Sequence, residues 1–471
     1  MKNIYYKSIF VFIICFYLLI QAGCTVGPDY KPQDVNAPAG WAGTKNVSSP
    51  DAMLLQWWTE FNDANLTSLI ERAMKSNLDL RQAEARIRES RAAAGVAGAA
   101  FWPTAEVTGS ATRDHSVTKT EITTISNTSN TFRAGLDASW ELDIFGGTRR
   151  NIEAAEADVN ASIEDRRDVM VTLVSEVATN YIQLRGYQQE IIIAKNNLKA
   201  QQQSAAVVRK RYEGGFVSAL DVANADAQVA TTMSQIPVLE TSAQQTIYSL
   251  SLLVGQNPAT LLEELTSISS IPSTPPEVPT GLPSEILRRR PDIRRAEAQI
   301  HAATARIGVA TADLFPKFNL AGSIAASKTK PGDSQRLLSF GPSASWEIFN
   351  AGRVSANIEV QKALQEQAVL TYKKTILIAI QDVENALSAY TNEKVHQKAL
   401  IDAVAANRKA VDLSTQLYVE GQTEFLSVLD AQRSLFSSED TLVQSTRNLS
   451  TDLIALYKAL GGGWSEDAST R

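Results

Sequence analysis

The stretches RYEGGFVSALDV, residues 211–222, and LYVEGQTEFLSV, residues 417–428, decide the fold because the second repeats the first. Four residues recur in the same order and at the same spacing, Tyr212, Gly215, Leu220 and Val222 becoming Tyr418, Gly421, Leu426 and Val428. The same offset carries Trp140-Glu141 onto Trp346-Glu347 and Gly255 onto Gly461. Such self-similarity across most of the chain indicates one structural unit used twice.

Long helices are expected before each repeated stretch. Apolar residues step by four and three in both halves, at Met170, Val174, Val177, Tyr181 and Leu184, and again at Ile376, Ile380, Val383, Leu387 and Tyr390. This is a coiled-coil spacing. It predicts long helices over residues 149–212 and 352–419, which contain no proline, and returning helices over 218–254 and 424–460. Shorter helices are predicted over residues 64–99 and 291–313.

Gly215 and Gly421 are expected to form the tight turns between the long and the returning helices, because glycine readily adopts a positive φ. Simple helix C-caps are enough to account for both glycines.

Each half also contains a predicted β-hairpin. Residues 132–142 and 340–348 alternate between apolar and polar or small side chains, and the preceding strands start near Ala105 and Phe318. The polar tracts 113–131 and 328–335 are expected to be solvent connections. Four strands cannot close a sheet, so closure needs copies from other chains, eight strands from two or twelve from three. Aromatic residues at the helix-proximal strand ends are expected to form a membrane-interface girdle: Trp102, Phe145, Phe315 and Phe349.

The N-terminus predicts export. Lys2 and Lys7 precede an apolar run at residues 9–20, a pattern typical of a secretory signal. The following Ala22-Gly23-Cys24 resembles the lipobox of bacterial lipoproteins, which implies a lipid on Cys24. Gln21 departs from that pattern, and a plain signal peptide that contains a cysteine is the alternative. Thr25 in place of an aspartate implies the outer membrane as the destination.

Composition excludes several classes of protein. The chain has 471 residues, 44% of them hydrophobic and 20% charged, with a net charge of −6. Without a large basic cluster, nucleic-acid binding is not expected. Two cysteines and three histidines leave little material for a metal site. No nucleophile–base pair or phosphate-binding glycine loop is apparent, so neither an enzyme nor any cofactor beyond the covalent lipid is expected.

Four motifs on this duplicated frame resemble TolC-type outer-membrane efflux lipoproteins of the OprM and NodT group: Cys24–Tyr30, Arg289–Ile293, Ala305–Ala310 and Phe315-Pro316. The resemblance implies a mainly α fold with a small β part, in which a trimer forms an α-helical tunnel and a twelve-stranded outer-membrane β-barrel. The predicted domains are a signal peptide (1–23), a lipidated linker (24–61), a first repeat (62–260), a Pro-rich connector (261–283) and a second repeat (284–471).

The same resemblance assigns roles at the turns. Leu426 and Asp430 match a pore gate, Asp221 and Tyr418 match a closed-state tether, and Gly215 and Gly421 lie at the tips that contact the adaptor. Asp430 is alternatively a solvated helix-face charge. The implied partners are two further copies of the chain, a periplasmic membrane-fusion adaptor, an inner-membrane RND-type transporter and outer-membrane lipid. The implied function is an efflux duct. A duct for type I protein secretion and a structural coiled-coil envelope lipoprotein remain alternatives.

Overall fold

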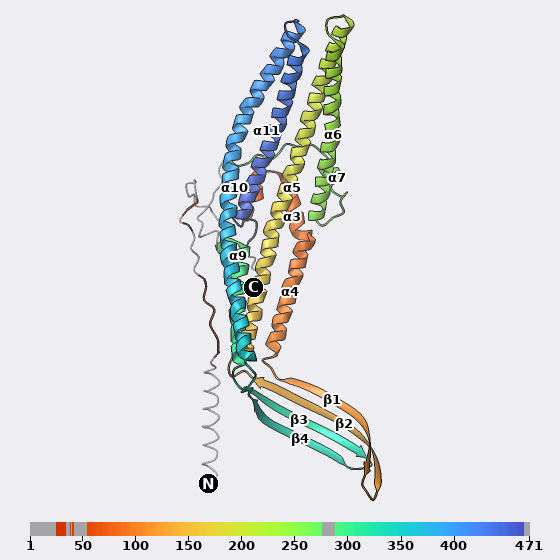
Figure 1. The fold of residues 1–471 in the computed structure, drawn as a ribbon, viewed down its shortest axis with the longest axis vertical. Helices are drawn as coiled ribbons and strands as arrows, with labels where there is room; N and C mark the ends of the chain where they lie inside the picture. The colour runs from red at the N-terminus through yellow and green to blue at the C-terminus, as the bar shows by residue number, and fades with distance from the viewer. Residues whose placement is uncertain (1–24, 34–37, 39, 42–53, 276–287, 466–471) are drawn as a thin grey trace. The chain divides into compact units, whose positions relative to one another are not determined.

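The computed structural model describes residues 25–33, 38, 40–41, 54–275 and 288–465. The first half contains η1 (Trp57–Phe61), α3 (Ala64–Ser76), α4 (Leu78–Ala99), β1 (Thr104–Lys119), β2 (Thr124–Leu142), α5 (Gly147–Glu213), α6 (Ala219–Leu253) and α7 (Leu262–Leu265). The second contains α9 (Pro291–Ala312), β3 (Lys317–Lys330), β4 (Ser334–Ser345), α10 (Arg353–Val419) and α11 (Phe425–Ala459). The order helix, hairpin, long helix and returning helix occurs twice (Figure 1), which confirms the predicted fold class.

Cys24 and the predicted signal peptide lie outside the described residues, as does part of the Pro-rich connector.

Two compact units make up the chain, and each is assembled from discontinuous segments. Unit 1 comprises residues 1–34, 86–163 and 295–373, and it holds the whole β-sheet. Unit 2 comprises residues 35–85, 164–294 and 374–471, and it holds both turns between long and returning helices. The long helices α5 and α10 therefore contribute residues to both units.

The sheet in unit 1 has the order β1-β2-β3-β4 and is antiparallel throughout. Its two faces differ as the alternation predicts. One row of directly paired residues is apolar on all four strands, namely Val107, Leu136, Ile324 and Leu338. The next row is polar, namely Glu106, Asp137, Ser323 and Ser339. All four apolar side chains are exposed, and β1 and β4 are the edges of the sheet.

The prediction that residues 113–131 form a solvent connection is wrong. β1 continues to Lys119 and β2 starts at Thr124, so only residues 120–123 turn. Residues 328–335 are likewise mostly strand, because β3 ends at Lys330 and β4 starts at Ser334. Threonine, which is frequent in the longer tract, is β-branched and favours strands. The full ladder of backbone hydrogen bonds between the strands therefore outweighs the polar composition.

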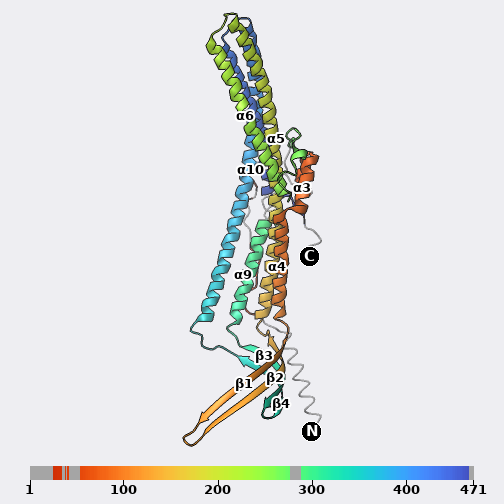
Figure 2. The ribbon, with the colours of Figure 1, turned by 90° about the vertical axis from the view of Figure 1, so that its right-hand side faces the viewer.

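Helices α5, α6, α10 and α11 pack together in unit 2 (Figures 1 and 2). The predicted coiled-coil positions face the core in both halves, since Val177 and Val383 are completely buried and their neighbours in each series are buried or half-buried. The same core includes Trp57 of η1, whose ring stacks on Tyr457 of α11 with centroids 5.1 Å apart. No helix in the described part of the chain is long and apolar enough to cross a membrane.

One helix boundary was missed. The helix predicted over residues 64–99 is two helices, because Asn77 interrupts it between α3 and α4. The Asn77 side-chain oxygen accepts hydrogen bonds from the backbone of Asp79 and Leu80, and its amide donates to the Leu253 carbonyl. Asparagine favours such caps over helix interiors.

Candidate functional site

The candidate site is the pair of turns in unit 2, which share one backbone geometry. Gly215 has φ +73° and Gly421 has φ +76°. After α5, Phe216 N–H donates to the Arg211 carbonyl at 2.8 Å, and after α10 Gln422 N–H donates to the Leu417 carbonyl at 2.9 Å. This is the Schellman arrangement, which satisfies the last carbonyls of a helix and needs a left-handed residue. The structure thus places Gly215 and Gly421 in the two tight turns predicted for them.

The helices that leave these turns start differently. α6 begins with a capping box, in which Ser218 and Asp221 each accept a hydrogen bond from the other's backbone N–H, at 3.3 Å and 3.0 Å. The Ser218 hydroxyl also donates to the Asp221 carboxylate at 2.8 Å. At the start of α11, Glu424 makes no side-chain cap. Asp221 is therefore already engaged within its own turn.

Arg211 joins the two turns. Its guanidinium lies 4.7 Å above the centre of the Tyr418 ring and donates a hydrogen bond to the Tyr418 carbonyl. Tyr418 in turn packs on Phe425, with ring centroids 5.6 Å apart. These contacts sit on a small apolar cluster formed by all four helices, with Val208, Ala225, Tyr418 and Val428 among its buried residues. Charge-assisted hydrogen bonds and cation–π contacts make Arg211 the main polar link between the turns.

The predicted tether partners are close, but they do not bond within the chain. The Tyr418 hydroxyl is buried and has no hydrogen-bond partner among the described residues. Burial raises the pKa of Tyr418, Arg211 opposes this, and the charge of Asp221 raises it further. A hydrogen bond between Asp221 and Tyr418 thus stays a prediction for the assembled channel.

The predicted gate residues share one face of α11. Leu426 and Asp430 are four residues apart and both exposed, while Phe425, Val428 and Leu429 on the other face are buried. Asp430 lies 4.0 Å from the Arg433 guanidinium, an exposed pair that adds little stability. The geometry leaves Leu426 and Asp430 free to face a shared pore, and it does not by itself assign them to one.

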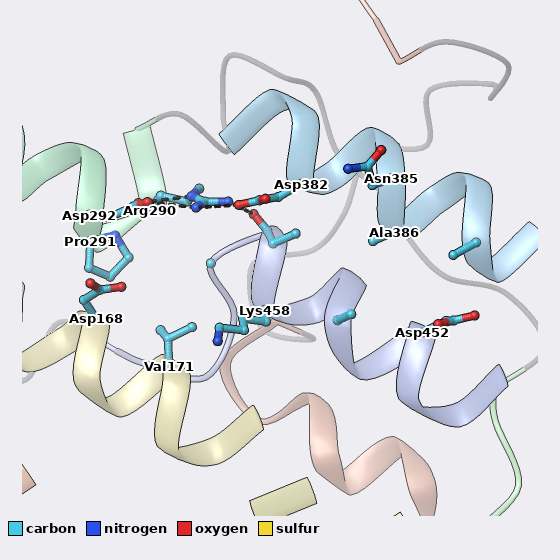
Figure 3. A pocket seen from close by; sticks show the side chains of 14 residues that line it. Asp168, Val171, Arg290, Pro291, Asp292, Asp382, Asn385, Ala386, Asp452 and Lys458 are labelled. Carbon is cyan, nitrogen blue, oxygen red and sulfur yellow. Dashed lines mark hydrogen bonds and ion pairs between the residues drawn. The ribbon is translucent and has the colours of Figure 1, made fainter. Parts of the chain in front are cut away.

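A second charged cluster in unit 2 surrounds Arg290, immediately before α9 (Figure 3). Arg290 is 9% exposed and donates to the Ala459 carbonyl at 3.0 Å, to Asp292 at 2.8 Å and to Asp382 at 3.2 Å. Burial alone would lower the pKa of Arg290, but the bonds to Asp292 and the charge of Asp382 raise it. These contacts join the start of α9 to α10 and to the end of α11.

The hollow beside Arg290 has a volume of about 480 Å³, and Asp452 and Lys458 also line it (Figure 3). The sequence predicted only that a helix starts at residue 291, and α9 does begin at Pro291, with Asp292 favourably placed in its first turn. The linking role of Arg290 has no local signal, because Asp382 and the Ala459 carbonyl, which it joins to α9, are distant from it in sequence.

The predicted interface aromatics are all in unit 1 but behave differently. Trp102 and Phe349 are 68% and 85% exposed. Phe145 and Phe315 instead stack on each other with centroids 4.5 Å apart. Within the described residues, no group of three or more histidine, cysteine, aspartate or glutamate side chains is placed to hold a metal ion.

Comparison with known proteins gives a consistent answer. Residues 69–256 and 282–462 match the family described as Outer membrane efflux protein. The chain is 33% identical over 458 residues to Nodulation protein T of Rhizobium leguminosarum bv. trifolii, covering 95% of this chain and 96% of that protein. It is 35% identical over 460 residues to the Pyoverdine export outer membrane protein OpmQ of Pseudomonas aeruginosa, with the same coverage of both proteins.

A solved structure of the outer-membrane channel OprN is similar with a TM-score of 0.85 and 36% identity, covering 94% of this chain and 100% of that one. These findings identify an outer-membrane exit channel rather than an enzyme. Two family matches, one on each structural repeat, span most of the sequence. The chain therefore belongs to the outer membrane efflux protein family.

Proposed function

We propose that this protein is the exit duct of a tripartite efflux pump, in which it conducts small molecules passively from a periplasmic adaptor and an inner-membrane RND-type transporter to the exterior. The single observation that carries the proposal is the duplicated unit, which couples a sheet with one exposed apolar face to two pairs of long helices. An apolar face of this extent suits a lipid surface.

A homotrimer is the proposed working form. The edges β1 and β4 leave unpaired backbone groups, and such edges are normally paired or protected. Pairing β1 of one copy with β4 of the next satisfies both edges. In lipid this closure is required, because water is absent to solvate free N–H and C=O groups. The polar rows of the sheet then face the lumen and the apolar rows face lipid.

The periplasmic turns are the proposed gate and adaptor contact. Leu426 and Asp430 are proposed to form apolar and acidic rings, since they lie on the exposed face of α11. Three symmetry-related carboxylates would attract cations, as charged rings do in other pores. Asp221 and Tyr418 are proposed to tether neighbouring elements in the closed state, and the turns at Gly215 and Gly421 to contact the adaptor.

A lipid on Cys24 is proposed to anchor each copy, and Trp102, Phe145, Phe315 and Phe349 are proposed to lie at the membrane interface. Type I protein secretion is the second candidate for the cargo. The relative named for pyoverdine export favours efflux of a compound over secretion of a protein.

Planar-bilayer recordings of the purified full chain test the duct directly. We expect stable single channels from a species that migrates as a trimer on mild-detergent gels and as a monomer after heating. Absence of conductance from that trimer would contradict a duct and favour a structural lipoprotein. Deletion of the gene should sensitise cells to some compounds in a drug-susceptibility panel. Loss of a secreted protein without any change in susceptibility would instead support type I secretion.

A further inference from the structure

The first described residues of the chain are built into unit 1. Val26 N–H donates to the Phe145 carbonyl at 3.1 Å, and Arg150 Nε donates to the Val26 carbonyl at 3.3 Å. Thr25 packs on the turn between β2 and α5, where a Cβ added to Gly146 would lie 2.8 Å from the Thr25 Cα. Both backbone groups of Val26 are thus satisfied by residues more than a hundred positions away, as in an ordered element.

Two glycines make this close approach possible. Gly27 has φ +91°, and a Cβ placed on it would lie 2.5 Å from the Cα of Gly308 on α9. A Cβ on Gly308 would lie 2.7 Å from Cγ of Arg150 on α5. The backbone of residue 27 therefore rests directly on the backbone of α9. Gly27 is required there both for its positive φ and for space, while Gly308 leaves room for the Arg150 side chain.

Charged and aromatic groups hold the segment beyond these glycines. The buried Arg150 guanidinium pairs with Asp29 at 2.5 Å and with Glu153 at 2.8 Å. Glu153 also contacts His301 at 2.9 Å, and the His301 ring stacks on Tyr30 with centroids 4.4 Å apart. Tyr30 completes the network by donating to Glu297 at 2.9 Å. Asp29 and Tyr30 are thus fixed by one continuous network on α5 and α9.

We propose that residues 25–30 form an N-terminal clamp, an intramolecular docking element that fastens the segment after Cys24 to α5 and α9. The clamp fixes the N-terminal end at the β2–α5 turn by protein contacts. A lipid joined to the residue before Thr25 would then be attached beside that turn, near the stacked Phe145 and Phe315. The clamp itself rests on no assumption about lipid or transport.

Hydrogen exchange at Val26 and chymotrypsin cleavage after Tyr30 test the clamp in the full-length protein purified from membranes. We expect Gly27→Ala to accelerate both by about tenfold or more, because its Cβ meets the backbone of Gly308. Asp29→Asn, which changes an exposed carboxylate without changing its shape, should accelerate both several-fold. Gly98→Ala is the matched control, since a Cβ there has nothing within 4 Å, and it should leave both rates as in wild type.

Wild-type protection in both Gly27→Ala and Asp29→Asn would overturn the clamp. If Gly27→Ala does not fold, Asp29→Asn decides alone, because the Asp29 side chain is 80% exposed and the substitution keeps its shape. Single-channel conductance of the same preparations is recorded separately. Faster exchange and cleavage in the variants support the clamp whether or not the channel conducts. Wild-type protein that is protected at residues 25–30 but does not conduct counts only against the proposed function.

Discussion

Arg211 is the residue on which the contact between the two helix turns depends, because it engages both the ring and the carbonyl of Tyr418. A hydrogen bond from a charged donor and a partly exposed cation–π contact together contribute about 2–4 kcal/mol. We expect Arg211→Ala to increase hydrogen exchange in residues 418–425 without unfolding the core. The exposed neighbour Lys210 provides the control for charge, and Lys210→Ala should leave that exchange unchanged. Equal exchange in both variants would remove Arg211 from this role.

A substitution of Tyr418 tests the tether of the assembled channel separately from the stability of the chain. Its buried hydroxyl has no partner among the described residues, so Tyr418→Phe removes a polar group that the single chain leaves unsatisfied. We expect an unchanged or slightly higher Tm together with a larger single-channel conductance, because the tether would be lost only in the assembly. Asp221→Ala should also raise the conductance, but at some cost in stability because the α6 cap is lost. Wild-type conductance in both variants would end the tether hypothesis.

Asp430 provides the test of the acidic ring. Asp430→Asn keeps the size of the side chain and removes its charge, so block of the channel by divalent cations should weaken several-fold. Asp226, an exposed aspartate on α6 paired with Arg209, offers a comparison at a position outside the proposed ring. If divalent cations block the Asp430→Asn channel, the Asp226→Asn channel and the wild-type channel equally, Asp430 is only a solvated helix-face charge.

Single residues can be predicted from the sequence where the conformation of a short local segment requires a particular residue type. Gly215 and Gly421 are found because a turn between helices needs a positive φ, and both have one. Arg211 is not found, since its partner Tyr418 lies in the other repeat and no spacing rule connects a cation to a distant carbonyl. Arg290 is not found either, because Asp382 and the Ala459 carbonyl are distant from it in sequence although they lie in the same repeat.

Substitutions in the sheet test directly which of its two faces contacts lipid. Leu338 lies in the exposed apolar row and Ser339 in the adjacent polar row. A lysine on a lipid-facing strand costs about 2–4 kcal/mol at the bilayer midplane and less near its surfaces. We therefore expect Leu338→Lys to reduce the amount of membrane-inserted protein, measured after fractionation, while Ser339→Lys inserts normally. The reverse result would mean that the two faces have been assigned the wrong way round.

Element boundaries follow from the sequence where chemistry is local. Both long helices and both returning helices end within a few residues of their predicted limits, because glycine turns and the end of each hairpin bound them. The break at Asn77 was missed because its cap is completed by the distant Leu253 carbonyl. The strands at residues 113–119 and 124–131 were missed because their pairing, rather than their polarity, determines the structure.

At the scale of the whole molecule, the free energy of unfolding is expected to depend on pH through Glu153, which pairs with the Arg150 and His301 side chains that hold the clamp. Burial opposes ionisation of Glu153, but Arg150 and His301 outweigh it and lower the pKa of the carboxyl below its ordinary 4.5. A lowered folded-state pKa stabilises the protein above the ordinary value, and this stabilisation is lost as the pH falls through the lowered one. Glu153→Gln should therefore melt earlier than wild type at pH 7, with a smaller difference near pH 3.5. A difference in Tm that does not change with pH would contradict this.

The duplication is visible in the sequence because equivalent positions recur at a nearly constant offset, and the resemblance to the channel family rests on four short motifs within that duplicated frame. The division into two units is not, because each unit gathers segments from three parts of the chain. Docking of the N-terminal residues is hidden as well. Arg150 and Gly308 follow Asp29 and Gly27 by long intervals, and nothing in residues 25–30 alone identifies their groove.

The unequal caps of α6 and α11 imply unequal populations of frayed helix. A side-chain cap is worth about 1 kcal/mol, which corresponds to roughly a fivefold change in the equilibrium between wound and unwound first turns. The first turn of α11 lacks that cap and carries Leu426, whereas Asp430 lies one turn further along. If Leu426 and Asp430 form the proposed rings, the apolar ring would widen in brief excursions of a single helical turn while the carboxylate ring stays in place. Permeation would then need no concerted movement of the long helices.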